Sequence, residues 1–259
     1  MMRIGVLGCG NIAGIIASRG AAVAQIVACH DKCSDRSERY AQRTGARHYP
    51  DIGTFLEADF PLLVEAASVA AVRDHLNDAL SRAKDVVVLS VGALAEPSLL
   101  GSAREIAAAN GRRIFVPSGA VFGLDNLKVA RISRFDRLLL RSTKPPRALG
   151  MGDCASRTCV FRGPASEAVR RYPRNINVSA AVGLAAGMEP QVEIWADPGV
   201  SSNQHQIEAQ GEFGKVAITT DNVPSPDNPA TSYLAALSVL TLLRDLADLA
   251  GDILGALAA

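Results

Sequence analysis

Short apolar runs alternate with helix-compatible stretches through the first 120 residues of the chain. The apolar runs, which are typical of buried strands, cover residues 3–7, 22–30, 62–67, 85–91 and 113–116. The stretch 69–83 between two of these runs predicts an amphipathic helix, and a further helix is expected over 97–110. Strands that alternate with helices imply right-handed crossovers and a parallel sheet. The pattern therefore predicts an α/β domain of the Rossmann type, with a doubly wound parallel sheet.

The pattern changes from about residue 122. Segments with the alternation of an antiparallel sheet that has one exposed face occupy residues 137–143, 191–196, 205–210 and 215–220. The last two are expected to form a hairpin around 211–214. Helices are expected over 164–172, 178–186 and, as a long apolar-rich stretch, 231–254. We therefore expect a second domain of the α+β class, built on a mostly antiparallel sheet.

A glycine-rich turn joins the first apolar run to the helix that follows it. Its sequence, Gly8-Cys9-Gly10-Asn11-Ile12-Ala13, matches the G-x-G-x-x-[GA] pattern, which by itself is weak evidence in a chain with 22 glycines. The strand-turn-helix frame strengthens it, because backbone N–H groups at such a turn can point at a pyrophosphate. Gly8 would permit the tight turn, Gly10 the close approach of the phosphate, and Ala13 the packing of helix on strand. We expect a dinucleotide to be bound by Gly8, Gly10, Asn11, Ile12 and Ala13.

Asp31 follows the second apolar run, 21 residues after Gly10. An acid at this spacing hydrogen-bonds the adenosine ribose hydroxyls in dinucleotide-binding folds, whereas the alternative is a solvated acid at a strand end. With strand, turn, helix, strand and acid in this order, we favour the ribose-binding role. Asp31 would repel a 2′-phosphate and so favours NAD as the cofactor. Lys32 and Arg36 could neutralise that phosphate, so NADP is expected to be tolerated.

Charge and composition exclude several classes of protein. The 259 residues include 27 basic and 26 acidic side chains, so nothing supplies the positive field that a general nucleic-acid or anionic-membrane partner needs. No apolar run approaches the roughly 18 to 20 residues of a membrane span, and the chain enters its first strand without a signal-peptide pattern. We expect a cytoplasmic protein with no nucleic-acid and no membrane partner.

The five cysteines form an odd set without paired metal spacing. Cys29 with Cys33, or Cys154 with Cys159, could contribute to a zinc site, but thiols in a reduced cytosol are the favoured interpretation. No metal is expected.

A nicotinamide enzyme needs a proton-transfer group and polar contacts for its substrate. Of the four histidines, His205 is distinct because it follows the Ser/Asn-rich loop 201–204 at the start of a strand, where an imidazole can face a cleft. The alternative is a solvent-facing histidine. Lys144 follows a strand and offers a cation for a substrate carboxylate, although an exposed lysine is the default there. Asn177 can cap the helix that follows it, or contact nicotinamide or substrate.

Five segments of the second half resemble those that mark the L-aspartate dehydrogenase family. They are PSGAVFGLDNLKVA (117–130), STKPP (142–146), YPRNINVSAAVGLA (172–185), ADPGVSSNQHQIEAQGEFG (196–214) and NPATSYLAALSVLTLLR (228–244). With the glycine turn they cover nearly the whole chain, and they lie outside the widely shared nucleotide fold. The resemblance implies NAD(P)-dependent oxidative deamination of L-aspartate to iminoaspartate, and then to oxaloacetate and ammonia. It also implies a homodimer and, in some organisms, a role in NAD biosynthesis.

The resemblance carries roles onto individual residues. It implies that His205 is the catalytic histidine and that Ala120 and Asn177 contact the nicotinamide side of the cofactor. We add three expected substrate contacts: Lys144, Asn175 and Asn203.

Two features depart from the family's usual pattern. Phe122 stands where a small residue is more common and could crowd the cleft. The region 147–171 is shorter than in many members, which affects part of the substrate-side wall.

These observations predict a dinucleotide-binding domain over 1–121, a substrate domain over 122–230, and a terminal segment, 231–259, that packs back on the first domain. Two alternatives remain open from the sequence. One is a reductase of the same architecture that acts on another imine or on an aldehyde. The other is a catalytically silent NAD-binding regulatory protein, against which the joint presence of His205, Asn177 and Lys144 argues.

Overall fold

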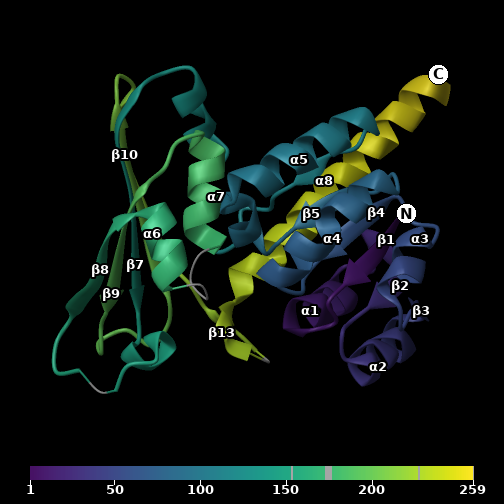
Figure 1. The fold of residues 1–259 in the computed structure, drawn as a ribbon, viewed down its shortest axis with the longest axis horizontal. Coiled ribbons are helices and arrows are strands. Elements are labelled where there is room, and N and C mark those ends of the chain that lie inside the picture. The colour runs from purple at the N-terminus through teal and green to yellow at the C-terminus, as the bar shows by residue number, and fades with distance from the viewer. Residues whose placement is uncertain (153, 173–176, 227, 259) are drawn as a thin grey trace. The chain divides into compact units, whose positions relative to one another are not determined.

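The computed structural model describes residues 1–152, 154–172, 177–226 and 228–258. The chain divides into two compact units: unit 1 contains Met1–Pro117 and Ala236–Ala259, and unit 2 contains Ser118–Ala235. Figure 1 shows the elements of both units. Among the described residues, no helix combines the length and the apolar character needed to cross a membrane.

Unit 1 is built on a six-stranded sheet in the order β3-β2-β1-β4-β5-β6, and its neighbouring strands all run parallel. The strands are β1 (Met2–Leu7), β2 (Ala24–His30), β3 (Arg47–His48), β4 (Leu62–Glu65), β5 (Asp85–Val88) and β6 (Ile114–Phe115). The order reverses between β1 and β4, so the carboxyl ends of these two strands flank the crevice in which such sheets bind ligands.

Helices cover both faces of the unit 1 sheet (Figure 1). They are α1 (Asn11–Arg19), α2 (Ser34–Thr44), α3 (Ile52–Glu57), α4 (Val69–Ser81), the 3-10 helix η1 (Val91–Ala95), α5 (Pro97–Ala109) and α8 (Tyr233–Ala258). Alternate residues of β1 face opposite layers: Val6 lies in a core cluster with Ile16 of α1 and Val239 of α8, whereas Leu7 lies beside Leu76 of α4. Burial on both faces explains why the strands are continuous apolar runs.

Unit 2 is built on a five-stranded sheet in the order β11-β10-β7-β9-β8. The strands are β7 (Phe135–Lys144), β8 (Thr158–Pro164), β9 (Gln191–Ala196), β10 (Gln204–Gly211) and β11 (Gly214–Asp221). Three of the four neighbouring pairs are antiparallel, and β7 with β9 is the parallel pair. The strands β10 and β11 form the predicted hairpin.

The remaining elements of unit 2 are short. They are the 3-10 helices η2 (Asn126–Arg131) and η3 (Pro146–Leu149), the helices α6 (Ala165–Arg171) and α7 (Asn177–Ala186), and the paired strands β12 (Pro224–Ser225) and β13 (Asn228–Ser232). Figure 1 shows α6 and α7 beside the five-stranded sheet. The predicted fold class, a doubly wound parallel sheet with a second α+β domain on a mostly antiparallel sheet, is confirmed.

Candidate functional site

The glycine turn of unit 1 leaves an open space at the start of α1. Gly8 has φ +90°, and a Cβ on it would lie 2.6 Å from the Cα atom of Ala67, so a side chain cannot be accommodated here. A Cβ on Gly10, in contrast, would meet no described atom within 4 Å. Gly10 is the N-cap of α1, and as a glycine it has no side chain to cap the helix. The backbone N–H groups at the start of α1 fit an anion such as a pyrophosphate.

Asp31 is attached to this turn by its side chain. Oδ2 accepts a hydrogen bond from the backbone N–H of Cys9 at 2.9 Å, and Oδ1 accepts one from Cys33 at 2.9 Å. Nη1 of Arg36 lies 3.4 Å from Oδ2, with its side chain half exposed. Asp31 is only 6% exposed, so the alternative of a solvated strand-end acid is wrong. Each carboxylate oxygen has two lone pairs, so Asp31 keeps acceptor capacity for ribose hydroxyls. These residues fit a dinucleotide.

A second polar cluster lies within the five-stranded sheet of unit 2. His205 of β10 is opposite Ser142 of β7 and opposite Thr220 of β11. Oγ of Ser142 lies 2.9 Å from Nδ1 of His205. Lys144 is two residues after Ser142 on β7, and alternation along the strand places it on the same face.

Burial controls the charge of this cluster. His205 is 5% exposed and Lys144 is 7% exposed, so the alternatives of a solvent-facing histidine and an exposed lysine are both wrong. Burial and, to a smaller extent, the nearby charge of Lys144 together lower the pKa of His205 to about 3. Burial also lowers the pKa of Lys144 to about 8. At neutral pH the cluster therefore holds a neutral imidazole beside a lysine that loses its proton more readily than usual.

Asn222 joins two of the predicted segments inside unit 2. Its Nδ2 donates to the carbonyl oxygen of Ala120 at 3.0 Å, and its backbone N–H donates to the carbonyl oxygen of Asn203 at 3.0 Å. Its own Oδ1 accepts a hydrogen bond from the hydroxyl of Ser232. The loop that contains Ala120 is thus held beside the loop that leads into β10 and His205.

The other predicted residues are more dispersed. Asn177 is the first residue of α7 and is exposed. Asn175 lies outside the described residues. Phe122 is 59% exposed. Three further residues make buried side-chain contacts that were not predicted from the sequence: Ser142, Asn222 and Glu65 of β4. Ser142 could have been found from its i, i+2 spacing to Lys144, but the register that brings it to His205 is not visible in the sequence.

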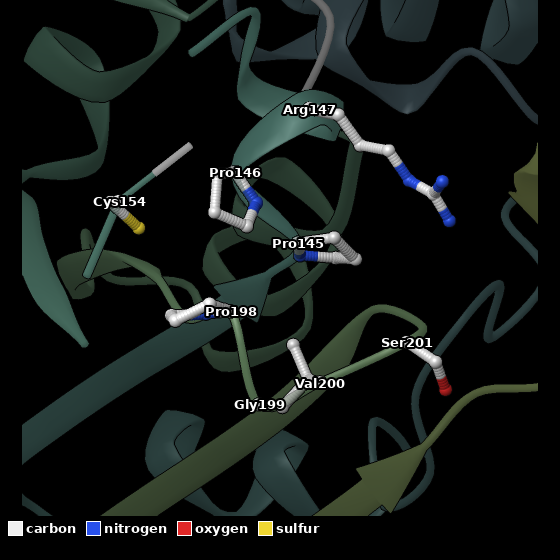
Figure 2. Close-up of a pocket in the computed structure, with 8 residues that line it drawn as sticks. All are labelled: Pro145, Pro146, Arg147, Cys154, Pro198, Gly199, Val200 and Ser201. Carbon is white, nitrogen blue, oxygen red and sulfur yellow. The ribbon is translucent and has the colours of Figure 1, made fainter. Parts of the chain in front are cut away.

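A cavity of about 350 Å³ adjoins the carboxyl end of β7 (Figure 2). Pro145 and Pro146, which follow Lys144 directly, form one wall, and the turn after β9, with Pro198 and Val200, forms another. The remaining lining residues are Arg147, Cys154, Gly199 and Ser201. Proline fixes the backbone φ, so these walls are stiff, and the volume suffices for a small amino acid.

The cysteines are all free thiols. Cys9 and Cys29 are buried, Cys33 is exposed, and Cys154 and Cys159 are half-buried. In the part of the chain that the structure describes, no three His, Cys, Asp or Glu side chains gather as a metal site would require.

Known proteins resemble this chain over nearly its whole length. A family model described as "Aspartate dehydrogenase, C-terminal" matches residues 125–246, and one described as "Homoserine dehydrogenase, NAD binding domain" matches residues 5–117. An L-aspartate dehydrogenase of Methanospirillum hungatei is 49% identical over 246 residues, which cover 95% of this chain and 97% of the relative. Another, of Methanothermobacter thermautotrophicus, is 41% identical and covers 96% and 97%.

The fold also resembles those of solved dehydrogenase structures. The crystal structure of aspartate dehydrogenase from Thermotoga maritima aligns with a TM-score of 0.80 at 27% identity, over 95% of this chain and 97% of that one. A homoserine dehydrogenase from Thiobacillus denitrificans, at 12% identity and a TM-score of 0.64, shares the fold alone. It covers 97% of this chain and 74% of that one.

Proposed function

Since the chain belongs to the L-aspartate dehydrogenase family, we propose that unit 1 binds the dinucleotide and that unit 2 supplies the substrate contacts and the proton-transfer group. The reaction is the NAD(P)-dependent oxidative deamination of L-aspartate to iminoaspartate, which is hydrolysed to oxaloacetate and ammonia. The observation that carries the assignment of roles is the buried cluster of Ser142, Lys144 and His205. The lysine cation can bind a carboxylate of the anionic substrate, and the neutral imidazole beside it can accept the proton that the substrate must lose.

His205 acts as the general base in this proposal. In this proposal Nδ1–H of His205 donates to Oγ of Ser142, so Nε2 is unprotonated. Nε2 is then the nitrogen that takes a proton, either from the substrate amine or from the water that attacks the imine carbon. The low pKa of His205 keeps the ring neutral across the working pH range, and it also makes the imidazole of the free enzyme a weak base. Lys144 pairs with a substrate carboxylate, and Asn203 and Asn175 provide further polar contacts.

The cofactor, when bound, accepts a hydride from the α-carbon of aspartate. In our proposal the first-turn N–H groups of α1 and the residues Gly8, Gly10, Asn11, Ile12 and Ala13 hold its pyrophosphate. Asp31 accepts hydrogen bonds from the adenosine ribose. Ala120 and Asn177 contact the nicotinamide side, and the bond from Asn222 to the carbonyl of Ala120 supports that loop. NAD is preferred because of Asp31, and NADP is accepted.

We further propose that the two units serve as separate cofactor and substrate domains, that the enzyme is a homodimer, and that it works in the cytoplasm. The free thiols of all five cysteines fit a reducing compartment.

A substrate screen tests the proposed function. The purified protein should reduce NAD steadily with L-aspartate and should not do so with other amino acids. Reduction driven by a different amine substrate would point to another reductase of this architecture. Cofactor binding with no turnover of any substrate would point to a silent NAD-binding protein.

A further inference from the structure

Glu65 is a buried carboxylate at the carboxyl end of β4, and four donors surround it. Its Oε1 accepts hydrogen bonds from the backbone N–H of Ala67 and from the hydroxyl of Ser90, both at 2.8 Å. Its Oε2 accepts from the backbone N–H groups of Leu89 at 3.1 Å and Ser90 at 2.9 Å. One side chain, 2% exposed, thus joins the segment after β4 to the segment after β5.

No cation offsets the charge of this carboxylate among the described residues. Burial raises the pKa of Glu65, and the hydrogen bonds from Ser90, Ala67 and Leu89 oppose that shift. Glu65 also lines a cavity of about 10 Å³, whose other lining side chains are apolar, such as Leu7 and Val88, except for His75. Holding an acid in such surroundings is costly, and an apolar residue would pack the sheet at a lower cost. The carboxylate therefore contributes by holding together the two segments after β4 and β5.

These segments follow the carboxyl ends of β4 and β5, the end of the sheet at which such folds bind ligands. The strand β4 is next to β1 where the strand order reverses, and the backbone of Ala67 is so close to Gly8 that a Cβ there would collide with it. Asp31, which we assign to the adenosine ribose, follows β2 on the other side of β1. The carboxyl ends of β4 and β5 therefore face the rest of a dinucleotide that spans the crevice between β1 and β4.

We propose that Glu65 is a positioning residue for the nicotinamide half of the cofactor: it fixes residues 66–68 and 89–91 in the shape against which that half binds. The inference rests on the proposed placement of the dinucleotide in unit 1. Glutamine cannot replace Glu65, because its amide nitrogen is a donor and one pair of the surrounding donors would then face it. Aspartate keeps the charge but is one methylene too short to bridge both segments.

Binding measurements without substrate test the proposal. Glu65→Gln should raise the Kd of NAD and of NADH at least tenfold, because the segments that receive the nicotinamide half lose their shape. The Kd of AMP, which contacts only the adenosine side, should stay within about twofold of the wild-type value. Glu65→Asp should behave like Glu65→Gln. Equal losses for AMP and NAD, or an NAD affinity that stays within twofold, would overturn the proposal.

A milder variant and a matched control complete the experiment. Ser90→Ala removes one of the four bonds and should weaken NAD binding severalfold with AMP binding unchanged, which keeps the proposal falsifiable if Glu65→Gln does not fold. Asp85→Asn is the control, because Asp85 lies at the amino end of β5, away from the ligand-binding end of the strand. Its side chain likewise accepts a hydrogen bond from a backbone N–H, that of Arg113 at 2.9 Å. It should leave both affinities unchanged, and an NAD-specific loss there would contradict us. If the proposed aspartate activity failed, NAD binding and its dependence on Glu65 would still be measurable.

Discussion

Ser142 and His205 face each other across the antiparallel pair of β7 and β10, with Oγ of one 2.9 Å from Nδ1 of the other. Both side chains are buried, so solvent does not compete for this bond. It holds the imidazole in one orientation and leaves Nε2 for proton transfer. In the proposed mechanism Ser142 therefore positions the base and does not react.

Ser142→Ala should lower kcat. The substitution leaves Nδ1 without its buried partner, which costs about 1–3 kcal/mol. This corresponds to a loss of roughly 5- to 150-fold in kcat if it is expressed in the transition state. The Kd of NAD should not change, because Ser142 is not among the residues that we assign to cofactor binding. Steady-state rates with L-aspartate and a separate NAD titration measure the two effects.

Thr220→Val is the matched control for that variant. Thr220 lies opposite His205 on β11, and its buried Oγ1 has no hydrogen-bond partner among the described atoms. Valine has nearly the same shape, so kcat should stay within about twofold and the protein should be no less stable. If Thr220→Val slowed the enzyme as much as Ser142→Ala, the packing around the ring would matter and the hydrogen bond would not.

The pKa of Lys144 predicts a falling limb in the pH profile. Its pKa is about 8, so the positive charge that we propose to pair with the substrate carboxylate is lost as the pH rises through that value, and kcat/KM should decline above about pH 8. Lys144→Arg keeps the charge at all relevant pH values and should move this limb upward. Lys144→Met should raise the KM of L-aspartate roughly 10- to 100-fold, the worth of a hydrogen bond to a charged group. A limb that stays in place in Lys144→Arg would remove Lys144 from substrate binding.

Much of this architecture could be predicted because its signals are local. The glycine turn, the helix after it and Asp31 lie within the first 31 residues, and the hairpin of β10 and β11 is closed by the short segment 211–214. Glu65 was missed because its role depends on β4 and β5 lying side by side, which brings donors 24 and 25 residues away onto one carboxylate.

A shortage of apolar positions explains why two elements were missed. The helix α2 is polar along most of its length and buries only Ser37 and Tyr40, so it carries almost no apolar stripe. The strand β8 lies at the edge of its sheet and buries only Phe161, so alternation between its two faces is faint. The burial of Lys144 was also missed, because a lysine at a strand end in sequence gives no sign of the layer that covers it.

His205 should make the protein sensitive to acid. Its pKa of about 3 in the folded state lies below its usual value of 6.5, so between these values the unfolded state binds the proton and the folded state does not. The stabilisation is full above pH 6.5 and is lost as the pH falls toward 3, by about 1.4 kcal/mol per pH unit. His205→Asn should therefore unfold at a less strongly pH-dependent temperature between pH 6 and about 4. Parallel declines in the Tm of both proteins would contradict this.

The same variants report on catalysis. His205→Ala and His205→Asn should both lower kcat roughly 10²- to 10⁴-fold, the usual contribution of one positioned proton-transfer group, because neither side chain can take a proton near neutral pH. The Kd of NAD should barely change. Stopped-flow measurement of NADH formation distinguishes this loss from slow product release. Variants within a few-fold of the wild type would show that His205 is structural.

The cofactor preference depends on Asp31. Asp31→Ala removes the acceptor for the ribose hydroxyls and the charge that repels a 2′-phosphate, so NAD should bind roughly 10- to 100-fold more weakly, with a smaller loss for NADP. Asp31 also holds the N–H groups of Cys9 and Cys33, and their release should weaken both cofactors alike. The ratio of the two Kd values cancels that common loss and is the quantity to measure.

Arg36→Ala provides the opposing variant. Its guanidinium is half exposed and lies 3.4 Å from Asp31, where it can neutralise a 2′-phosphate, so its removal should weaken NADP binding and leave NAD binding nearly unchanged. The two substitutions should thus move the ratio of the Kd of NAD to that of NADP in opposite directions, upward for Asp31→Ala and downward for Arg36→Ala. If the ratio stayed constant in Asp31→Ala, the carboxylate would serve only to hold the glycine turn, and a different residue would have to select between the two cofactors.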